Sequence, residues 1–153
     1  MRVALGSDHA GYELKSLLAT TLVGWGYDLM DLGTSSASES VDYPDFGAAV
    51  GRAVAAGDAD LGVAVCGSGI GVSIAANKVP GVRAALVHDV TSARLAREHN
   101  HANVLCFGER LIGKSVAIDA LEAWLTTAPG EGRHLGRIAK LGVLDEHPNE
   151  RER

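Results

Sequence analysis

The stretch Leu61-Gly-Val-Ala-Val-Cys66, followed by Gly67-Ser-Gly-Ile-Gly71, decides the fold class of this chain. Residues 61–66 form an apolar run of strand length with no polar side chain, as expected for a strand covered by helices on both faces. Residues 67–71 alternate glycine with other residues directly before a segment of helical pattern. Together they predict a strand, a tight turn and a helix, which is the repeating unit of a parallel sheet.

The same alternation of strand and helix extends in both directions along the chain. Strands are predicted at 3–5, 27–32, 61–66, 82–87 and 104–107, and helices at 14–25, 43–56, 70–78, 91–98, 112–125 and 132–144. Repeated units of this kind join by right-handed crossovers and form a parallel sheet sandwiched between helices. The pattern leaves the order of the strands in the sheet open.

Length, charge and cysteine content limit the class of protein. The 153 residues, 46% of them hydrophobic and 22% charged, predict a single domain over 1–153 with a polar, frayed tail at 145–153. A net charge of −5 argues against a general nucleic-acid or anionic-membrane partner. The N-terminal apolar run is too short for a signal peptide or a membrane span, and two cysteines are too few for a disulfide scaffold, so we expect a cytoplasmic protein.

Polar and nucleophilic side chains gather where the predicted strands end. They are Asp8 and His9 after the first strand, Cys66 with the glycine loop after the third, His88 and Asp89 after the fourth, and 108–110 after the fifth. Ligands of parallel α/β sheets bind at the carboxyl ends of the strands. These residues are therefore the candidate site.

The glycine loop 67–71 is compatible with two structures. Its backbone N–H groups can point into one concavity at a helix N-terminus and bind an anion, or the loop can be a plain tight turn. Val72-Ser73 stands where a nucleotide-binding P-loop needs lysine followed by serine or threonine, and Val72 also replaces the third glycine of the dinucleotide fingerprint. A low-molecular-weight phosphatase loop needs arginine at the same position. A small anion or an oxyanion is the remaining ligand class.

The two cysteines are expected to lie in different environments. Cys66 begins the glycine loop, where N–H donors at a helix start favour the thiolate and Ser68 can hydrogen-bond the sulfur. A cysteine that ends an apolar strand can equally be an inert core residue. Cys106 lies in the fifth predicted strand without such a loop, so we place it in the core.

The C-terminal half carries further candidates for acid–base and anion chemistry. His99 and His101 flank Asn100 at a helix end, which fits either a favourable dipole interaction or general acid–base catalysis. Because no compact cluster of further ligands lies nearby in sequence, zinc is not expected. Arg133 and Arg137 stand four residues apart on one helix face, either to bind a phosphate together or as a solvated basic face.

Short motifs spanning residues 6 to 137 occur in a characteristic order. They are Gly6-Ser-Asp-His-Ala-Gly-Tyr12, Asp42-Tyr-Pro44, Cys66-Gly-Ser-Gly-Ile-Gly71, Ala75-Ala-Asn-Lys78, Arg97-Glu-His-Asn100, Asn103-Val-Leu105 and Gly132-Arg-His134. Their combination resembles ribose-5-phosphate isomerase type B and its relatives that act on allose 6-phosphate and galactose 6-phosphate. The resemblance implies a Rossmann-like α/β/α sandwich with a five-stranded parallel sheet. It also implies an enzyme without cofactor or metal, and a homodimer with shared active sites, a tetramer being left open.

The resemblance further implies aldose–ketose isomerisation through an enediolate. Cys66 would move the proton between C2 and C1, His99 would assist ring opening, and Ser68 would lie next to the thiolate. One branch of the family has a glutamate where Val72 stands here, and because valine accepts no proton, Cys66 is left as the base. The implied substrate contacts are the N–H groups of Gly67, Ser68, Gly69, Ile70 and Gly71 for the oxyanion, Asp8, His9, Tyr43 and Asn100 for the sugar, and Arg110, Arg133 and Arg137 for the phosphate.

Three functions stay open at this point. The favoured one is interconversion of ribose 5-phosphate and ribulose 5-phosphate in the pentose phosphate pathway. A six-carbon phosphosugar such as allose 6-phosphate or galactose 6-phosphate is the alternative substrate, since one extra carbon changes selectivity by only about 1–3 kcal/mol. A non-catalytic nucleotide-binding module is the alternative of a different class, and it leaves Cys66, His99 and the arginine pair without a joint purpose.

Overall fold

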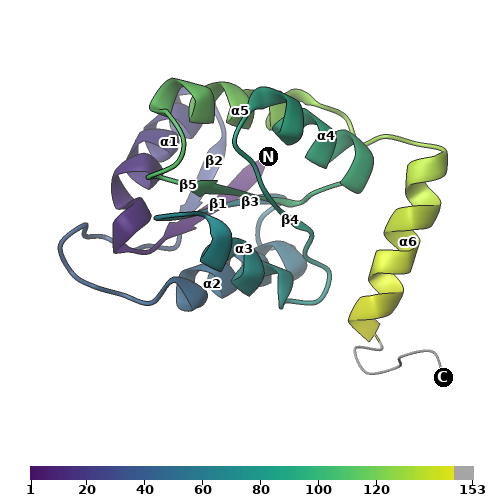
Figure 1. Cartoon of the computed structure of the whole chain (residues 1–153), viewed down its shortest axis with the longest axis horizontal. Coiled ribbons are helices and arrows are strands. Elements are labelled where there is room, and N and C mark those ends of the chain that lie inside the picture. Colours follow the sequence, from purple (N-terminus) through teal and green to yellow (C-terminus); the bar gives the residue numbers. More distant parts are fainter. Residues whose placement is uncertain (147–153) are drawn as a thin grey trace.

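The computed structural model describes residues 1–146 and contains one parallel sheet of five strands (Figure 1). The strands are β1 (Arg2–Ser7), β2 (Asp28–Asp31), β3 (Leu61–Cys66), β4 (Ala84–Leu86) and β5 (Val104–Gly108). Their order in the sheet is β2-β1-β3-β5-β4, and every neighbouring pair is parallel. The predicted five-stranded parallel sheet is confirmed, and the structure supplies the strand order.

Helices cover both faces of the sheet (Figure 1). On one face lie α1 (Tyr12–Gly24), α4 (Val90–Asn100) and α5 (Lys114–Thr126), and on the other lie α2 (Tyr43–Ala55) and α3 (Ile70–Asn77). A short 3-10 helix, η1 (His9–Gly11), joins β1 to α1. The crossover from β1 to β2 runs along the sheet in one direction, and the crossovers that lead to β3 and to β4 run in the other. Right-handed connections therefore place α1 on one face of the sheet and α2 and α3 on the opposite face. The predicted α/β/α sandwich is confirmed.

Side chains of alternating strand residues divide the core into two clusters. Along β1, Val3 and Leu5 point to the cluster under α1, α4 and α5, whereas Ala4 points to the cluster under α2 and α3. The first cluster holds the largest buried side chains, Trp124 and Phe107. All six residues of β3 are buried, as expected for a strand between two helical layers.

The structure shortens some predicted elements and lengthens others. Strand β4 contains only residues 84–86 of the predicted 82–87, because Val82 closes a turn by donating its N–H to the Val79 carbonyl. Helix α5 begins at Lys114 and not at 112, since the N–H of Ile112 is still held by the Gly108 carbonyl at the end of β5. Helix α4 reaches Asn100, two residues beyond the predicted end.

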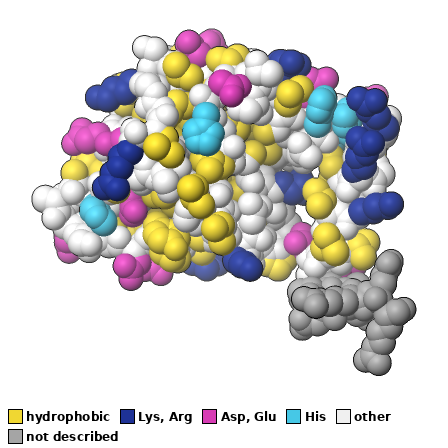
Figure 2. Space-filling model, in the orientation of Figure 1, with side chains coloured by type: hydrophobic (Ala, Val, Ile, Leu, Met, Phe, Trp, Pro, Cys, Tyr) yellow, Lys and Arg dark blue, Asp and Glu magenta, His cyan; other side chains and the backbone are white. Residues whose placement is uncertain are grey.

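Helix α6 (Arg133–Glu146) stands apart from the sandwich and has no buried residue (Figure 1). It continues two residues into the segment expected to be a frayed tail, because Asp145 accepts a hydrogen bond from the Gly81 N–H (2.8 Å). The remainder of that predicted tail, 147–153, lies outside the described residues. Figure 2 shows basic side chains gathered along α6 with histidines beside its upper end. No helix in residues 1–146 has the length and apolar character required to cross a bilayer.

Candidate active site

The carboxyl ends of β1, β3 and β5 surround an open cavity of about 500 Å³, called here the strand-end cavity. It opens where the chain leaves the neighbouring strands β1 and β3 in opposite directions, the usual ligand position in such sheets. Its lining residues are Asp8, His9, Ala10, Tyr43, Cys66, Gly67, Ser68, Ile70, Gly71, Ile74 and Arg110. Of these, only Ala10 and Ile74 were not among the sequence candidates, since neither small nor aliphatic residues carry a chemical signal.

Cys66 ends β3 at the floor of the strand-end cavity, with only 4% of its surface exposed. Its Sγ accepts a hydrogen bond from the Gly69 N–H at 3.1 Å. The structure shows no hydrogen bond from Ser68 to the sulfur within residues 1–146; the Ser68 hydroxyl oxygen accepts the Ile70 N–H (3.2 Å) at the start of α3. The sulfur is thus held by a backbone donor of the glycine loop at the edge of the cavity.

Gly69 allows the loop to lie flat against β5. Its φ of +76° belongs to the left-handed region, where a side chain is disfavoured. A Cβ at this position would lie 2.7 Å from the carbonyl carbon of Phe107 and 2.8 Å from the Gly108 nitrogen. The loop conformation that presents its N–H to Cys66 therefore requires glycine.

The other two loop glycines make room for site side chains. A Cβ on Gly67 would lie 3.1 Å from Arg110 Nη1, and a Cβ on Gly71 would lie 2.6 Å from the ring of Tyr43. The Arg110 N–H also donates to the Gly67 carbonyl at 3.0 Å, which ties the end of β5 to the loop. The glycines thus seat the tyrosine and the arginine, a function that their spacing alone did not indicate.

The second cysteine is confirmed as a core residue. Cys106 is fully buried in β5 beneath α2 and α3. Burial raises the pKa of its thiol far above the ordinary value, and nearby Cys66 raises it further. Cys106 therefore stays neutral, while Cys66 alone of the two borders the strand-end cavity.

Asp8 and His9 enter the cavity from the end of β1. Asp8 Oδ1 accepts the Gly11 N–H at 3.0 Å and so caps η1, while the Asp8 N–H donates to the Val65 carbonyl at 3.3 Å. His9 Nδ1 accepts the N–H of Val41 at 3.2 Å. Both side chains are held by backbone groups, which leaves one carboxylate oxygen of Asp8 and one ring nitrogen of His9 for a ligand.

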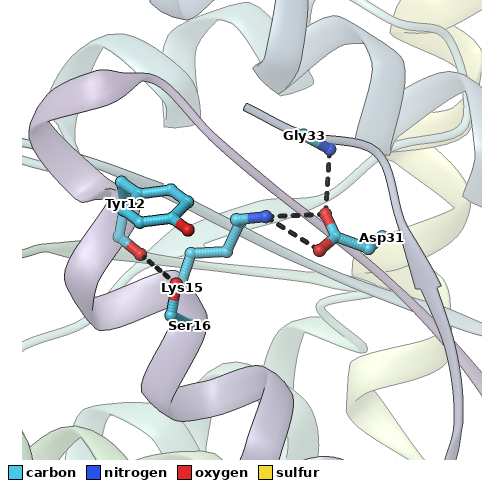
Figure 3. Close-up of polar contacts among 5 residues, drawn as sticks. All are labelled: Tyr12, Lys15, Ser16, Asp31 and Gly33. Carbon is cyan, nitrogen blue, oxygen red and sulfur yellow. Dashed lines mark hydrogen bonds and ion pairs between the residues drawn. The ribbon is translucent and has the colours of Figure 1, made fainter. Parts of the chain in front are cut away.

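A buried ion pair anchors the segment that leaves β2 (Figure 3). Lys15, whose side chain is 4% exposed, places Nζ 2.7 and 2.9 Å from the two carboxylate oxygens of Asp31 and 5.6 Å from the ring centre of Tyr12. Asp31 Oδ1 also accepts the Gly33 N–H at 2.9 Å. The Gly33 carbonyl in turn accepts the Ser7 N–H at 2.7 Å, so this pair connects α1, β2 and the end of β1.

Five predicted site residues do not line the strand-end cavity. They are Gly69 in the glycine loop, His99 and Asn100 at the end of α4, and Arg133 and Arg137 on α6. His99 stacks on His134, with ring centroids 4.5 Å apart and planes inclined by 13°. We call His99, Arg133, His134 and Arg137 the α4–α6 cluster. One chain therefore does not bring all of the predicted residues together in one site.

The α4–α6 cluster is suited to an anion. Its neighbours displace water from His134 and lower the pKa of that ring, and nearby His99, Arg133 and Arg137 lower it further, with Glu98 opposing them. Within residues 1–146, neither arginine of the cluster forms an ion pair. The positive charges are thus free to meet a phosphate.

Of the two polar residues after β4, Asp89 has a structural role. Asp89 caps α4 by accepting the Ser92 N–H at 2.6 Å, and this hydrogen bond lowers the pKa of its carboxyl. Neither His88 nor Asp89 lines the strand-end cavity. Across residues 1–146, no three side chains among histidine, cysteine, aspartate and glutamate are grouped to hold a metal ion.

The strand-end cavity combines the groups needed to move a proton at carbon. A thiolate can act as a base, the loop N–H groups can face a developing oxyanion, and Arg110 can meet an anion. The class so defined is a parallel α/β protein with a cysteine and an anion-binding loop at the strand ends.

Comparison with known proteins identifies the family. The family model described as Ribose/Galactose Isomerase matches residues 3–141. The chain is 41% identical over 148 residues to ribose-5-phosphate isomerase B of Escherichia coli, covering 97% of this chain and 99% of that protein. It is 43% identical over 152 residues to ribose-5-phosphate isomerase B of Mycolicibacterium paratuberculosis, covering 97% and 96%.

The solved structures agree with the sequence comparisons. The structure of Clostridium thermocellum ribose-5-phosphate isomerase B matches with a TM-score of 0.95 and 47% identity, covering 97% of this chain and 100% of that one. The chain therefore belongs to the ribose/galactose isomerase family. The resemblance of its motifs is confirmed.

Proposed function

We propose that this protein interconverts ribose 5-phosphate and ribulose 5-phosphate. The observation that carries the proposal is Cys66 at the floor of the strand-end cavity, with its sulfur on the Gly69 N–H and with Asp8, His9, Tyr43 and Arg110 around it. Three relatives from its family bear the name ribose-5-phosphate isomerase B and match over nearly their whole length. The protein acts in the cytoplasm, where both free thiols stay reduced.

The reaction requires one proton to move between adjacent carbons. The Cys66 thiolate removes the proton from C2 of the open-chain aldose, and the C2–H electrons form the C1=C2 bond while the aldehyde oxygen becomes an enediolate oxyanion. The N–H groups of 67–71 that are not held by Cys66 Sγ or the Ser68 hydroxyl stabilise that charge. The Cys66 thiol then returns the proton to C1, and the proton of the C2 hydroxyl passes to the oxyanion on C1, which gives the ketose with its C2 carbonyl and C1 hydroxyl. The thiolate is regenerated.

The remaining side chains bind the substrate. Asp8, His9 and Tyr43 contact the sugar hydroxyls, and Arg110, seated over Gly67, contacts the phosphate. Ser68 keeps its hydroxyl proton available beside Cys66, because its oxygen accepts the Ile70 N–H.

The site is completed by a second copy of the chain. His99, Asn100, Arg133 and Arg137 lie outside the strand-end cavity of their own chain. The cavity is open, and Ile70 and Ile74 at its edge are about half exposed. Helix α6 has no buried residue and exposes the apolar side chains of Leu135, Leu141, Val143 and Leu144, which a partner would cover. In this homodimer the α4–α6 cluster reaches the partner's cavity, where His99 assists ring opening and the arginines bind the phosphate.

A matched pair of cysteine variants tests the proposed function. Cys66→Ala should abolish formation of ribulose 5-phosphate while circular dichroism stays native-like, since a base contributes about 100-fold to 10,000-fold. Cys106→Ala makes the same chemical change in the core and should retain turnover. Near-full activity of Cys66→Ala would contradict the assignment. Parallel assays on allose 6-phosphate and galactose 6-phosphate establish the preferred chain length.

A further inference from the structure

A backbone hydrogen bond selects one tautomer of the neutral His9 ring. Its Nδ1 accepts the N–H of Val41 at 3.2 Å, although the two residues are 32 positions apart. A ring nitrogen that accepts a hydrogen bond carries no proton, and a neutral imidazole has its single proton on the other nitrogen. The contact therefore selects the tautomer with the proton on Nε2.

The donor itself is fixed in place at both ends of its segment. At the start, the Gly33 carbonyl accepts the Ser7 N–H, the Thr34 N–H donates to the Ser7 carbonyl, both at 2.7 Å, and Asp31 holds the Gly33 N–H while paired with Lys15 (Figure 3). At the other end, 42–43 leads directly into α2, whose first residue lines the strand-end cavity. Val41 thus presents its N–H from a segment tied to β1 and α2.

The free nitrogen of His9 is the one left for a ligand. His9 lines the strand-end cavity together with Asp8 and Tyr43, and its Nε2 has no hydrogen-bond partner among residues 1–146. Asp8 already uses Oδ1 for the Gly11 N–H, which leaves Oδ2 as an acceptor. Two consecutive residues therefore offer the cavity one acceptor and one donor, a pairing that matches a sugar hydroxyl, which both donates and accepts.

We propose that the main-chain N–H of Val41 is a positioning group that makes His9 a hydrogen-bond donor, through Nε2–H, to an oxygen of the bound phosphosugar. Segment 33–42, which the Lys15–Asp31 pair anchors, then orients the His9 ring toward the sugar through the Val41 N–H. The backbone of this segment contributes no reacting group. The inference rests on the proposed function, because it specifies one contact of that site.

Nuclear magnetic resonance reads the tautomer without substrate. In protein labelled with ¹⁵N-histidine at a pH above neutrality, long-range ¹H–¹⁵N spectra separate the protonated from the unprotonated ring nitrogen, and the signals lost in His9→Asn assign His9. We expect Nε2 to be protonated and Nδ1 to be bare, unchanged in Val41→Ala, which keeps the backbone N–H. A proton on Nδ1, or an averaged mixture of tautomers, would overturn the inference.

Two amide variants of His9 test the donor in catalysis. Asparagine places its amide near the Nδ1 position and can still accept from Val41, but it lacks a group at Nε2; glutamine places an NH₂ donor near Nε2. We expect kcat/KM for ribose 5-phosphate to be about ten-fold higher in His9→Gln than in His9→Asn, mainly through KM, as for loss of one substrate hydrogen bond. Equal values, or a better asparagine variant, would refute the donor role. An inactive wild-type protein would overturn the proposed function and with it the phosphosugar as the acceptor, whereas a proton on Nδ1, measured without substrate, would overturn the positioning role of Val41 alone.

Discussion

A heterodimer carrying Cys66→Ala in one subunit and His99→Asn in the other should regain activity that both parent homodimers lack. Cys66 lines the strand-end cavity, whereas His99 stacks on His134 outside it. If each site combines the cavity of one subunit with the α4–α6 cluster of the other, one site of this heterodimer contains both lesions and the second contains none. The purified heterodimer should therefore have about half of the wild-type kcat, one of its two symmetry-related sites being intact.

The background against which this recovery is measured is low. Loss of a general acid or base costs about 100-fold to 10,000-fold in rate, so each parent homodimer should retain at most about 1% of wild-type activity. The two chains are co-expressed with different affinity tags and purified over both tags in turn. Initial rates of ribulose 5-phosphate formation from ribose 5-phosphate are then compared at equal subunit concentration.

A matched heterodimer with both lesions in one subunit separates the alternatives. With shared sites, a wild-type chain paired with the Cys66→Ala/His99→Asn double variant has one lesion in every site and should be inactive. With sites completed inside one chain, this arrangement would retain about half of the activity and the first heterodimer would have none. That reversed result would refute the division of the site between subunits.

Three further outcomes follow from contacts in the structure. The main effect of Gly71→Ala should be a higher KM for the phosphosugar, with a smaller effect on thermal stability, because the new Cβ would lie 2.6 Å from the ring of Tyr43. An unchanged KM in steady-state kinetics would contradict the role of Gly71 in making room for that ring. Lys15→Met should lower the free energy of unfolding by about 1–3 kcal/mol, less than for a fully buried pair because Asp31 is 47% exposed, as measured by denaturant titration; an unchanged midpoint would show that the pair adds nothing. Local desolvation, and after it the neighbouring positive charges, lower the pKa of His134 in the folded protein. The folded protein therefore binds a proton at His134 less readily than the unfolded chain does. As a result, the free energy of unfolding falls as the pH drops through the ordinary titration range of histidine. His134→Gln should flatten that decline in thermal melts over pH, and an identical pH profile would argue against it.

Local patterns carried most of the information about the secondary structure. The bounds of β3 were predicted to the residue because an apolar run that ends at a glycine loop has few alternative structures. The ends of β4 and α5 were less accurate because they depend on turn hydrogen bonds, such as Val82 to the Val79 carbonyl. The end of a helix also depends on hydrogen bonds to distant residues, which a periodic pattern of apolar residues does not reveal. The hydrogen bond from the Gly81 N–H to Asp145 near the end of α6 is an example.

The candidate site was only partly accessible to sequence reasoning. Residues that follow strands converge because parallel strands share one carboxyl edge, which is why Asp8, Cys66 and Arg110 meet in the strand-end cavity as expected. The contact between Val41 and His9 gave no signal, since a main-chain donor has no residue type. Lys15 gave none either, because a lysine in a helix is usually at the surface.

By itself the sequence determined the fold class, the family and the residue types at the strand ends, because each depends on short segments whose residue types and spacing act locally. Only the tertiary structure decided the strand order, the contact between Val41 and His9 and the separation of the α4–α6 cluster from the strand-end cavity. These depend on the direction in which each crossover packs and on contacts between residues far apart in the chain. Such contacts are set by the packing of whole elements, which no single stretch of sequence specifies.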